Sequence, residues 1–144
     1  MNSDANRLEG TVGKSALTPR LDAIGITTAD MTSSFAFYRA LGFEIPEGLE
    51  QEPHAEITLP SGLRFMWDSV ELTSSLHAGY VHAPNHNLAA FLCASPAGVD
   101  SKFESVLLAG GSAVKAPWDA FWGQRYAQVA DPDGHVVDLF APLE

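Results

Sequence analysis

The chain has 144 residues, enough for one domain with a substantial core, and its 46% hydrophobic and 18% charged residues are typical of a folded globular protein. The formal net charge of -10 argues against a nucleic-acid or anionic-membrane partner, because phosphate groups are bound by clustered Lys and Arg. The single cysteine, Cys93, excludes an internal disulfide. Since no apolar run reaches the length of a membrane span and the N-terminus lacks a signal-peptide core, we expect a cytoplasmic protein.

The first half of the chain is predicted to contain one strand, one helix and three further strands. Residues 1–19 are polar and are expected to form a flexible N-terminal arm before a single domain over residues 20–144. The expected elements are a strand at 21–28, a helix at 31–41, a strand at 43–47, and a hairpin of strands at 55–59 and 63–68. Asp30 or Thr32 can cap the helix through a side-chain oxygen, and Gly42 can end it.

The second half repeats this order after a connection at residues 69–86 that shows no clear periodicity. Its expected elements are a strand at 87–93, a helix at 98–109, a short strand at 112–115 and a final hairpin over 121–140. Gly42 and Gly110 end the two helices at equivalent places. The repetition predicts an α+β fold of two βαβββ modules, at about 20–68 and 86–142, which form curved mixed sheets around a cavity.

The final hairpin turns at the sequence Asp-Pro-Asp-Gly. Pro132 presets the φ angle of a turn and Gly134 can take a positive φ, so we expect a three-residue loop with Asp131 opposite His135. This register places apolar side chains on one face, namely Ala127, Val129, Val137 and Leu139. It places polar and aromatic side chains on the other face, with the facing pairs Gln128–Asp138 and Tyr126–Phe140. We therefore expect a helix against the first face and a ligand or solvent against the second.

Four stretches of the chain carry a family resemblance. They are Leu-Asp-Ala-Ile-Gly-Ile at 21–26, Phe-Tyr-Arg-Ala-Leu-Gly-Phe at 37–43, Trp-Gly-Gln-Arg-Tyr at 122–126 and Asp-Pro-Asp-Gly-His at 131–135. Together they resemble the vicinal-oxygen-chelate superfamily, which contains glyoxalase I, extradiol dioxygenases, fosfomycin-resistance enzymes and bleomycin-resistance proteins. The resemblance covers about residues 20–142 and implies paired βαβββ modules that are often completed as a dimer, so we expect a homodimer.

The metal-dependent members that the chain resembles hold one divalent ion by His or carboxylate side chains from the first and last strands of each half. The corresponding positions here are Ala23, Met66, Asn87 and Asp138. A methyl group cannot coordinate an ion and a neutral amide is a weak ligand, so only Asp138 is a good candidate. We therefore expect neither a metal ion nor another cofactor.

The register of the strand at 87–93 leaves one alternative open. Shifting it by one residue would turn His86 inward, and a shift of this kind reverses the side of every residue in the strand. It would send three apolar side chains into the cavity, namely Leu88, Ala90 and Leu92. The favoured inward set is Asn87, Ala89 and Phe91.

Alternation along the strands predicts which side chains line the cavity. The expected ligand-binding residues are Glu56, Arg64, Met66, Asn87, Phe91, Trp118, Trp122, Tyr126, Gln128, Asp138 and Phe140. Glu56 should lie opposite Met66 with Arg64 nearby. We expect a Glu56–Arg64 ion pair, and the alternative role of Glu56 is that of a catalytic base.

The last hairpin supplies the sharper part of this predicted site. Asp138, if partly buried, needs a partner such as Tyr126 or Gln128, and its role is either that of a hydrogen-bonded remnant of a metal site or that of a ligand-binding carboxylate. Trp118 and Trp122 either close the core or offer planar rings that stack on planar or cationic ligands.

These features predict a metal-free small-molecule-binding protein of the glyoxalase/bleomycin-resistance type, which sequesters a partly aromatic ligand as antibiotic-resistance members of the superfamily do. The acidic balance of the chain suits a cationic ligand. One alternative is a metal-dependent lyase, isomerase or dioxygenase that uses Asp138, or a metal-free enzyme that uses Glu56. A further alternative is an interaction module with a filled cavity.

Overall fold

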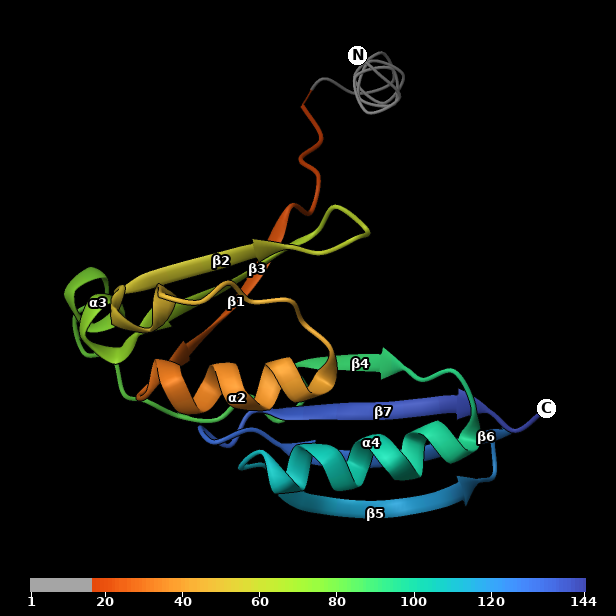
Figure 1. The fold of residues 1–144 in the computed structure, drawn as a ribbon. Helices are drawn as coiled ribbons and strands as arrows, with labels where there is room; N and C mark the ends of the chain where they lie inside the picture. The colour runs from red at the N-terminus through yellow and green to blue at the C-terminus, as the bar shows by residue number, and fades with distance from the viewer. Residues whose placement is uncertain (1–16) are drawn as a thin grey trace.

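The computed structural model describes residues 17–144, so most of the predicted N-terminal arm lies outside the described residues. The elements, in chain order, are β1 (Ala23–Thr28), α2 (Met31–Leu41), the short 3₁₀ helix η1 (Leu49–Gln51), β2 (His54–Thr58), β3 (Arg64–Ser69), α3 (Val70–Leu76), β4 (Ala89–Leu92), α4 (Pro96–Leu108), β5 (Ser112–Ala120), β6 (Gln124–Ala130) and β7 (Val136–Pro142). The strands form a first sheet in the order β1-β3-β2 and a second sheet in the order β4-β7-β6-β5. Both sheets are mixed, as the α+β prediction requires (Figure 1). None of the described helices is long and apolar enough to cross a membrane.

Helix α2 lies between the two sheets, alongside α4, which covers one face of the second sheet (Figure 1). An element in this position has to bury apolar side chains on two sides. Phe35 and Tyr38 pack against Trp67 of the first sheet, with ring centroids 5.1 and 5.9 Å away. On the opposite side the ring of Phe37 approaches the end of α4 so closely that a Cβ atom on Gly111 would lie 2.7 Å from it.

The predicted ends of α2 are confirmed. The side chain of Asp30 accepts a hydrogen bond from the Ser33 N–H, which satisfies one of the free donors of the first turn. Gly42 follows the helix with a φ of 120° and donates its N–H to the carbonyls of Tyr38 and Arg39. Because L-residues rarely adopt this backbone conformation, the glycine fixes where the helix ends.

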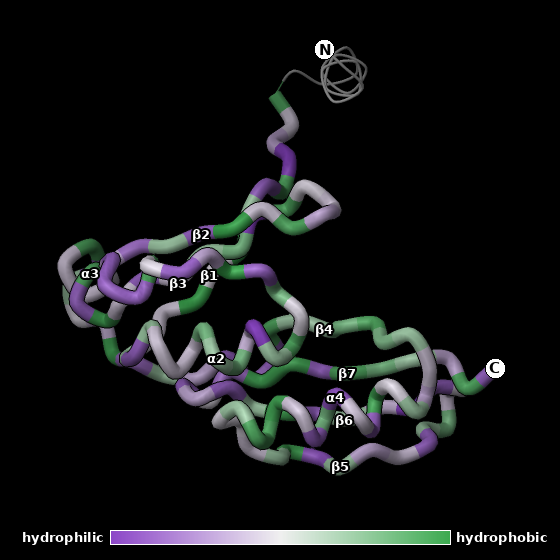
Figure 2. Tube along the Cα trace, viewed as in Figure 1, coloured by the Kyte–Doolittle hydropathy of each residue, from purple (hydrophilic) through white to green (hydrophobic). Residues whose placement is uncertain are grey.

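The register of the final hairpin is also confirmed. The Asp131 N–H donates to the His135 carbonyl at 2.8 Å, and both predicted facing pairs are found. The apolar face is fully buried and consists of Ala127, Val129, Val137 and Leu139. Helix α4 covers it with Val99, Phe103 and Val106. In Figure 2, hydrophobic segments dominate β4, whereas hydrophilic segments are frequent around β2, β3 and α3.

The Asp-Pro-Asp-Gly-His turn joins the two modules, a role that sequence reasoning missed. Asp131 is only 2% exposed, and its carboxylate accepts the Tyr38 hydroxyl of α2 at 2.8 Å. Asp133 Oδ1 accepts the Ala29 N–H at 2.8 Å, and the His135 Nε2 atom lies 2.9 Å from the Thr27 carbonyl oxygen. We call these contacts the turn clamp. They attach the end of β1 and the middle of α2 to the second sheet.

The predicted strand at 43–47 is wrong, because the structure shows no strand there. Arg39 provides the physical reason: its guanidinium donates to the Ile45 carbonyl at 2.8 Å and to the Pro46 carbonyl at 3.0 Å. It also pairs with Glu50 at 3.2 Å. Backbone acceptors that would otherwise bond to a neighbouring strand are thus satisfied by a side chain, and the first sheet keeps three strands.

Three other boundaries differ from the prediction. The connection at 69–86 contains α3, which Ser69 caps by accepting the Leu72 N–H at 3.0 Å. The short strand predicted at 112–115 extends as β5 to Ala120, so Trp118 lies within a strand. Helix α4 begins at Pro96 rather than at residue 98, because Ser95 caps it and proline suits the first helical turn.

Candidate functional site

The predicted ligand-binding residues are distributed over both sheets. Glu56, Arg64 and Met66 lie on the first sheet, and the residues of the final hairpin lie on the second. Within the described part of the chain, the interactions of these two groups remain within their own sheets. The structure therefore presents two separate surfaces, which we call the charged face and the aromatic face.

The aromatic face is built around the carboxylate of Asp138. Tyr126 donates its hydroxyl to Asp138 Oδ2 at 2.5 Å, and Gln128 donates its amide to Oδ1 at 3.1 Å. Both partners predicted for Asp138 are thus present. Partial burial, followed by the neighbouring carboxylate, raises the pKa of Tyr126 to about 12, so its hydroxyl keeps its proton at neutral pH.

Three further aromatic side chains contact Tyr126, the partner of this carboxylate. Residues that pair across the strands point to the same side, so Trp118, Tyr126 and Phe140 share the face of Asp138. Tyr126 contacts Trp118, Trp122 and Phe140, with ring centroids 5.6, 5.3 and 6.1 Å apart. Trp122 remains 48% exposed, so part of this ring system is available for a ligand. The aromatic face comprises Trp118, Trp122, Tyr126, Gln128, Asp138 and Phe140.

A cation already occupies one ring of this face. The Nζ atom of Lys115 lies 4.6 Å from the centroid of the Trp118 ring. Lys115 pairs with Gln128 across β5 and β6, which brings it onto the same side of the sheet. The ring of Trp118 is therefore placed where a positive charge can approach its π-electron face.

The charged face contains the predicted Glu56–Arg64 ion pair, with a distance of 2.8 Å. Glu56 also lies opposite Met66, as expected. The same guanidinium pairs with Asp22 at 2.8 Å. Hydrogen bonds from His54 and then from Arg64 hold the pKa of Glu56 below its usual range. A carboxylate with a lowered pKa is a poor proton acceptor, which argues against Glu56 as a catalytic base.

Sequence reasoning missed His54 on this face. Its Nδ1 atom lies 2.6 Å from Asp68 Oδ1, and its Nε2 atom lies 3.0 Å from Glu56 Oε1. The hydrogen bond to Asp68, followed by that to Glu56, raises the pKa of His54. The available signal was strand alternation, since His54 and Glu56 are two residues apart on β2 and must share a side.

The favoured register of the strand at 87–93 is wrong. Strand β4 runs parallel to β7 and pairs Ala90 with Asp138 and Leu92 with Phe140. Phe91 pairs with Leu139 and therefore lies on the opposite side from the aromatic face, 5.6 Å from the ring of Phe43. Ala90 and Leu92 therefore lie on the side of Asp138, as in the alternative register that is shifted by one residue. An apolar strand that is hydrophobic on both sides carries no alternation from which its register could be predicted.

Asn87 and His86 also lie outside the aromatic face. Both are exposed and precede β4, and the Asn87 N–H donates to the side chain of Asn85 at 3.0 Å. The inward turn that the shifted register suggested for His86 is therefore not found.

The four positions at which the resemblance implies a metal ion do not fit one. Ala23 and Met66 lie on the first sheet, whereas Asp138 lies on the second. Asp138 already accepts a hydrogen bond on each oxygen. A methyl, a thioether, an exposed amide and one engaged carboxylate do not make a divalent-ion site.

A second group of possible ligands lies in the turn clamp. One ligand atom each from Asp131, Asp133 and His135 lie within 4.8 Å of one another. His135 Nδ1 accepts the Asn85 N–H at 2.9 Å, which places the ring proton on Nε2 and leaves no free lone pair. The Asp131 carboxylate accepts three hydrogen bonds. Asp133 Oδ2 is buried without a partner, but one free oxygen does not hold an ion, so this group is structural.

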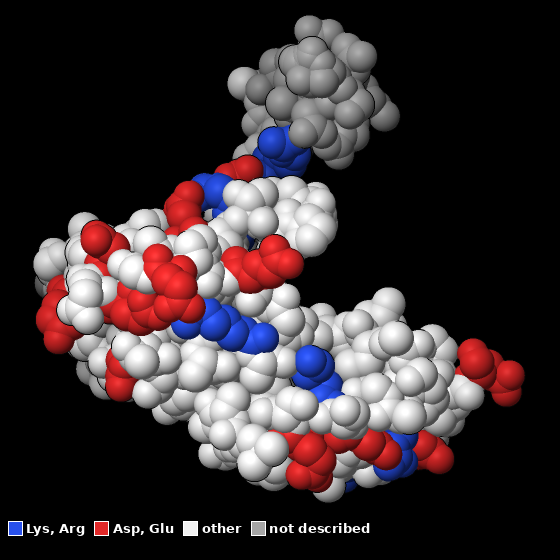
Figure 3. Space-filling view, in the orientation of Figure 1, with Lys and Arg blue, Asp and Glu red and all other residues white. Residues whose placement is uncertain are grey.

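Acidic side chains are prominent on the visible surface. In Figure 3 they crowd the region of the first sheet and also lie along the edge of α4 and β5, whereas basic side chains lie beside the hollow between the sheets and next to acidic ones at both edges. The overall excess of acidic side chains, with a net charge of -10, favours the approach of cations.

Comparisons with known proteins agree with this architecture. The sequence profile of the Glyoxalase/Bleomycin resistance protein/Dioxygenase superfamily matches residues 20–139. The chain is similar to a glyoxalase-related enzyme from Fulvimarina pelagi, with a TM-score of 0.75, 19% identity, and coverage of 86% of this chain and 88% of that one. It is also similar to a glyoxalase/bleomycin resistance protein/dioxygenase family enzyme from Burkholderia phytofirmans PsJN, with a TM-score of 0.71, 19% identity, and coverage of 87% of this chain and 100% of that one.

A curated relative matches over a shorter stretch. An uncharacterized protein from Mycobacterium bovis is 49% identical over 45 residues, which amount to 31% of this chain and 30% of that protein. The match thus spans less than a third of that relative's length, and the two solved structures are similar in fold alone. The profile match covers most of the chain, and the chain therefore belongs to the Glyoxalase/Bleomycin resistance protein/Dioxygenase superfamily.

Proposed function

We propose that this chain is a metal-free binding protein that sequesters a small, partly aromatic cation on its aromatic face. The observation that carries the proposal is the hydrogen bond between the Asp138 carboxylate and Tyr126, whose ring contacts Trp118, Trp122 and Phe140. A planar cation could stack on the partly exposed Trp122 ring while its charge is balanced by Asp138.

The energetics favour a cation over a neutral or anionic ligand. A cation over an aromatic face gains roughly 0.5 to 2 kcal/mol, with the larger values where water is excluded. The net charge of -10 adds a long-range attraction for cations and a repulsion of anions. The Nζ atom of Lys115 already lies over the Trp118 ring, so the partly exposed Trp122 is the ring proposed to receive the ligand.

The chemistry of the side chains supports binding more than catalysis. Three of the four positions that correspond to family metal ligands are Ala23, Met66 and Asn87, so no ion and no other cofactor is part of the proposal. Glu56 has a lowered pKa and two partners, which makes it an unsuitable base for a metal-free reaction. A lyase, isomerase or dioxygenase activity therefore has no specific observation in its favour.

We further propose a cytoplasmic homodimer in which the partner covers the aromatic face. The side chain of Phe121 is 96% exposed and contacts the Trp122 ring with centroids 5.0 Å apart. Such an exposed ring favours an additional partner surface. The charged face of a second copy would add further acidic groups for a cationic ligand, as in sequestration of a drug.

Titration of tryptophan fluorescence with 9-aminoacridine, a planar aromatic cation at neutral pH, tests the proposal. Quenching and saturation at one equivalent per site are expected for the wild type. Trp122→Ala should weaken binding about tenfold, because stacking of an aromatic side chain on a planar ring system such as a nucleic-acid base contributes about 1 to 3 kcal/mol. Leu108→Ala, at an exposed position on α4 on the opposite side of the second sheet, serves as the control and should bind with little change. Equal binding by the wild type and Trp122→Ala would contradict the proposal.

A further inference from the structure

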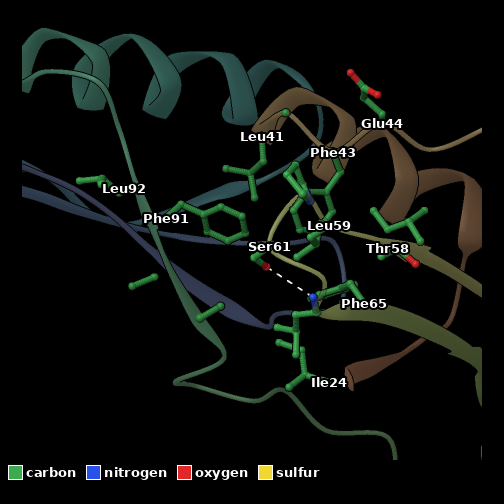
Figure 4. A pocket seen from close by; sticks show the side chains of 16 residues that line it. Ile24, Leu41, Phe43, Glu44, Thr58, Leu59, Ser61, Phe65, Phe91 and Leu92 are labelled. Carbon is green, nitrogen blue, oxygen red and sulfur yellow. Dashed lines mark hydrogen bonds between the residues drawn. The ribbon is translucent and has the colours of Figure 1, made fainter. Parts of the chain in front are cut away.

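A cavity lies between the two sheets, at the edge of β4 that is not paired with β7. Its volume is about 1060 Å³, at the upper end of the range typical of small-molecule pockets. The walls come from β1, the end of α2, the β2–β3 hairpin and β4, and they are mainly apolar. Figure 4 shows the rings of Phe43, Phe65 and Phe91 and the side chain of Leu41 grouped around this space.

The cavity exists because the fold leaves an apolar surface uncovered at this point. The segment after α2 does not form the fourth strand of the first sheet, since Arg39 holds the carbonyls of Ile45 and Pro46. Strand β4 pairs only with β7, so its other edge borders the cavity. Nonpolar walls of this size favour a nonpolar ligand, because binding removes the apolar surface of both the ligand and the walls from contact with water.

A smaller cavity continues the space toward α4. It has a volume of about 380 Å³ and shares three lining residues with the larger one, namely Leu41, Phe91 and Leu92. Its far wall includes Cys93, Ser101 and Lys102. We call the two cavities together the inter-sheet groove. The groove is thus long and apolar, with a basic side chain at one end.

Lys102 is the feature that assigns a charge to the ligand. Its Nζ atom donates to the Ala40 carbonyl at 2.9 Å, and no carboxylate among residues 17–144 pairs with it. The arginines Arg39, Arg64 and Arg125, by contrast, each pair with at least one carboxylate. A half-buried ammonium group with spare donors favours an anion. The acidic residue along the groove, Glu44, is exposed, and Figure 4 shows its carboxylate directed away from the apolar side chains.

We propose that the inter-sheet groove binds a long-chain carboxylate, with its alkyl tail against Leu41, Phe43 and Phe65 and its carboxylate at Lys102. This site differs from the aromatic face in position and in the sign of the ligand charge. Phe91, which the sequence had assigned to the predicted site, belongs to the groove instead. The proposal does not depend on the cation-binding function.

Isothermal titration of the full chain with hexadecanoate, below its critical micelle concentration, tests the charge assignment. Hexadecanoate should bind at one equivalent per chain and at least tenfold more tightly than hexadecan-1-ol, which has the same tail without the charge. Lys102→Met keeps the apolar stem and should remove most of this difference, since a charge-assisted hydrogen bond corresponds to about a tenfold change or more. Lys115→Met, on the second sheet, is the matched control and should leave the affinity unchanged. Equal affinity for the acid and the alcohol would overturn the assignment.

Two further measurements test the location. Leu59→Glu introduces a carboxylate at a half-buried hairpin position that lines the groove and should abolish binding, whereas Leu108→Glu, at an exposed position on α4, should not. Bound hexadecanoate should also slow alkylation of Cys93, the chain's single cysteine. Binding without protection of Cys93 would place the ligand outside the smaller cavity and overturn the proposal. The proposal would also be overturned if hexadecanoate does not bind and the wild type forms a dimer that Leu59→Glu dissociates. The groove would then be an interface between two copies of the chain. None of these results alters the Trp122→Ala comparison, which tests the aromatic face separately.

Discussion

Removing the Tyr38 hydroxyl tests the turn clamp. In Tyr38→Phe the ring stays in the core, but Asp131 Oδ2 loses the donor that lies 2.8 Å away. Since Asp131 is only 2% exposed, water cannot readily replace that donor. Hydrogen bonds to charged groups contribute about 1.5 to 3 kcal/mol, so the free energy of unfolding should fall by roughly 2 kcal/mol. For a chain of this size the thermal midpoint should fall by about 5 °C.

Tyr126→Phe is a matched control for this change. It also removes a tyrosine hydroxyl from a carboxylate, Asp138, but that contact is only partly buried and Gln128 remains as a second donor. The loss of stability should therefore be below about 1 kcal/mol. Urea unfolding followed by circular dichroism measures both variants. An equal or smaller loss for Tyr38→Phe would refute the reasoning that burial of the clamp determines the cost.

The pH dependence of the Tyr38→Phe effect gives a second check. Burial raises the pKa of Asp131, so the folded protein holds a proton that the unfolded chain has already released, and stability falls as pH rises through this window. The Tyr38 hydrogen bond acts in the opposite direction and lowers that pKa. Its loss should therefore matter most at neutral pH, and the difference from the wild type should shrink in acidic buffer, where Asp131 is protonated. A difference that is constant with pH would contradict this linkage.

Further predictions concern the charged face, the helix contact and the segment after α2. Asp68→Asn should lower the raised pKa of His54 in an NMR titration. In the wild type, the stability that His54 contributes is fully present below about pH 6.5, the pKa of histidine in the unfolded chain, and is lost as pH rises through the pKa in the folded protein. A result in which Asp68→Asn leaves that pKa unchanged would exclude Asp68 as the main cause. Gly111→Ala should destabilise the fold by about 1 to 3 kcal/mol, because the new Cβ would lie 2.7 Å from the Phe37 ring, whereas Gly98→Ala, in α4 with a nearest contact of 3.4 Å, should be neutral or stabilising in the same urea assay. Arg39→Met should increase hydrogen exchange at residues 43–50 by freeing two carbonyls, and unchanged exchange there would disprove the role of its guanidinium.

The sequence predicted well those features that local chemistry determines. Asp30 and Gly42 define the ends of α2 through capping, and Pro132 and Gly134 define a turn that sets the register of the last hairpin. With this register known, the pairing of Gln128 with Asp138 and of Tyr126 with Phe140 followed by alternation. The Glu56–Arg64 pair was predictable for the same reason.

Features that depend on distant contacts were not predictable in this way. The segment at 43–47 has the composition of a strand, and only the position of Arg39 shows why it does not pair. The Leu-Ala-Ala-Phe-Leu stretch at 88–92 is apolar on both sides, so the side on which Phe91 lies depends on its pairing with β7. Likewise, Asp131 and Asp133 looked like turn residues, whereas their contacts to Tyr38 and Ala29 cross between modules. Sequence distances of about a hundred residues give no local pattern for such contacts.

The central claim is that Asp138 selects a cation on the aromatic face, and the effect of Asp138→Asn on ligand preference tests it most directly. The amide keeps the shape of the side chain while removing its charge. We predict that the wild type binds 9-aminoacridine at least tenfold more tightly than neutral acridine, since a charge-assisted contact contributes about 1.5 kcal/mol or more. In Asp138→Asn this preference should nearly vanish, with the affinity for acridine unchanged. An undiminished preference in the variant, or none in the wild type, would contradict the account.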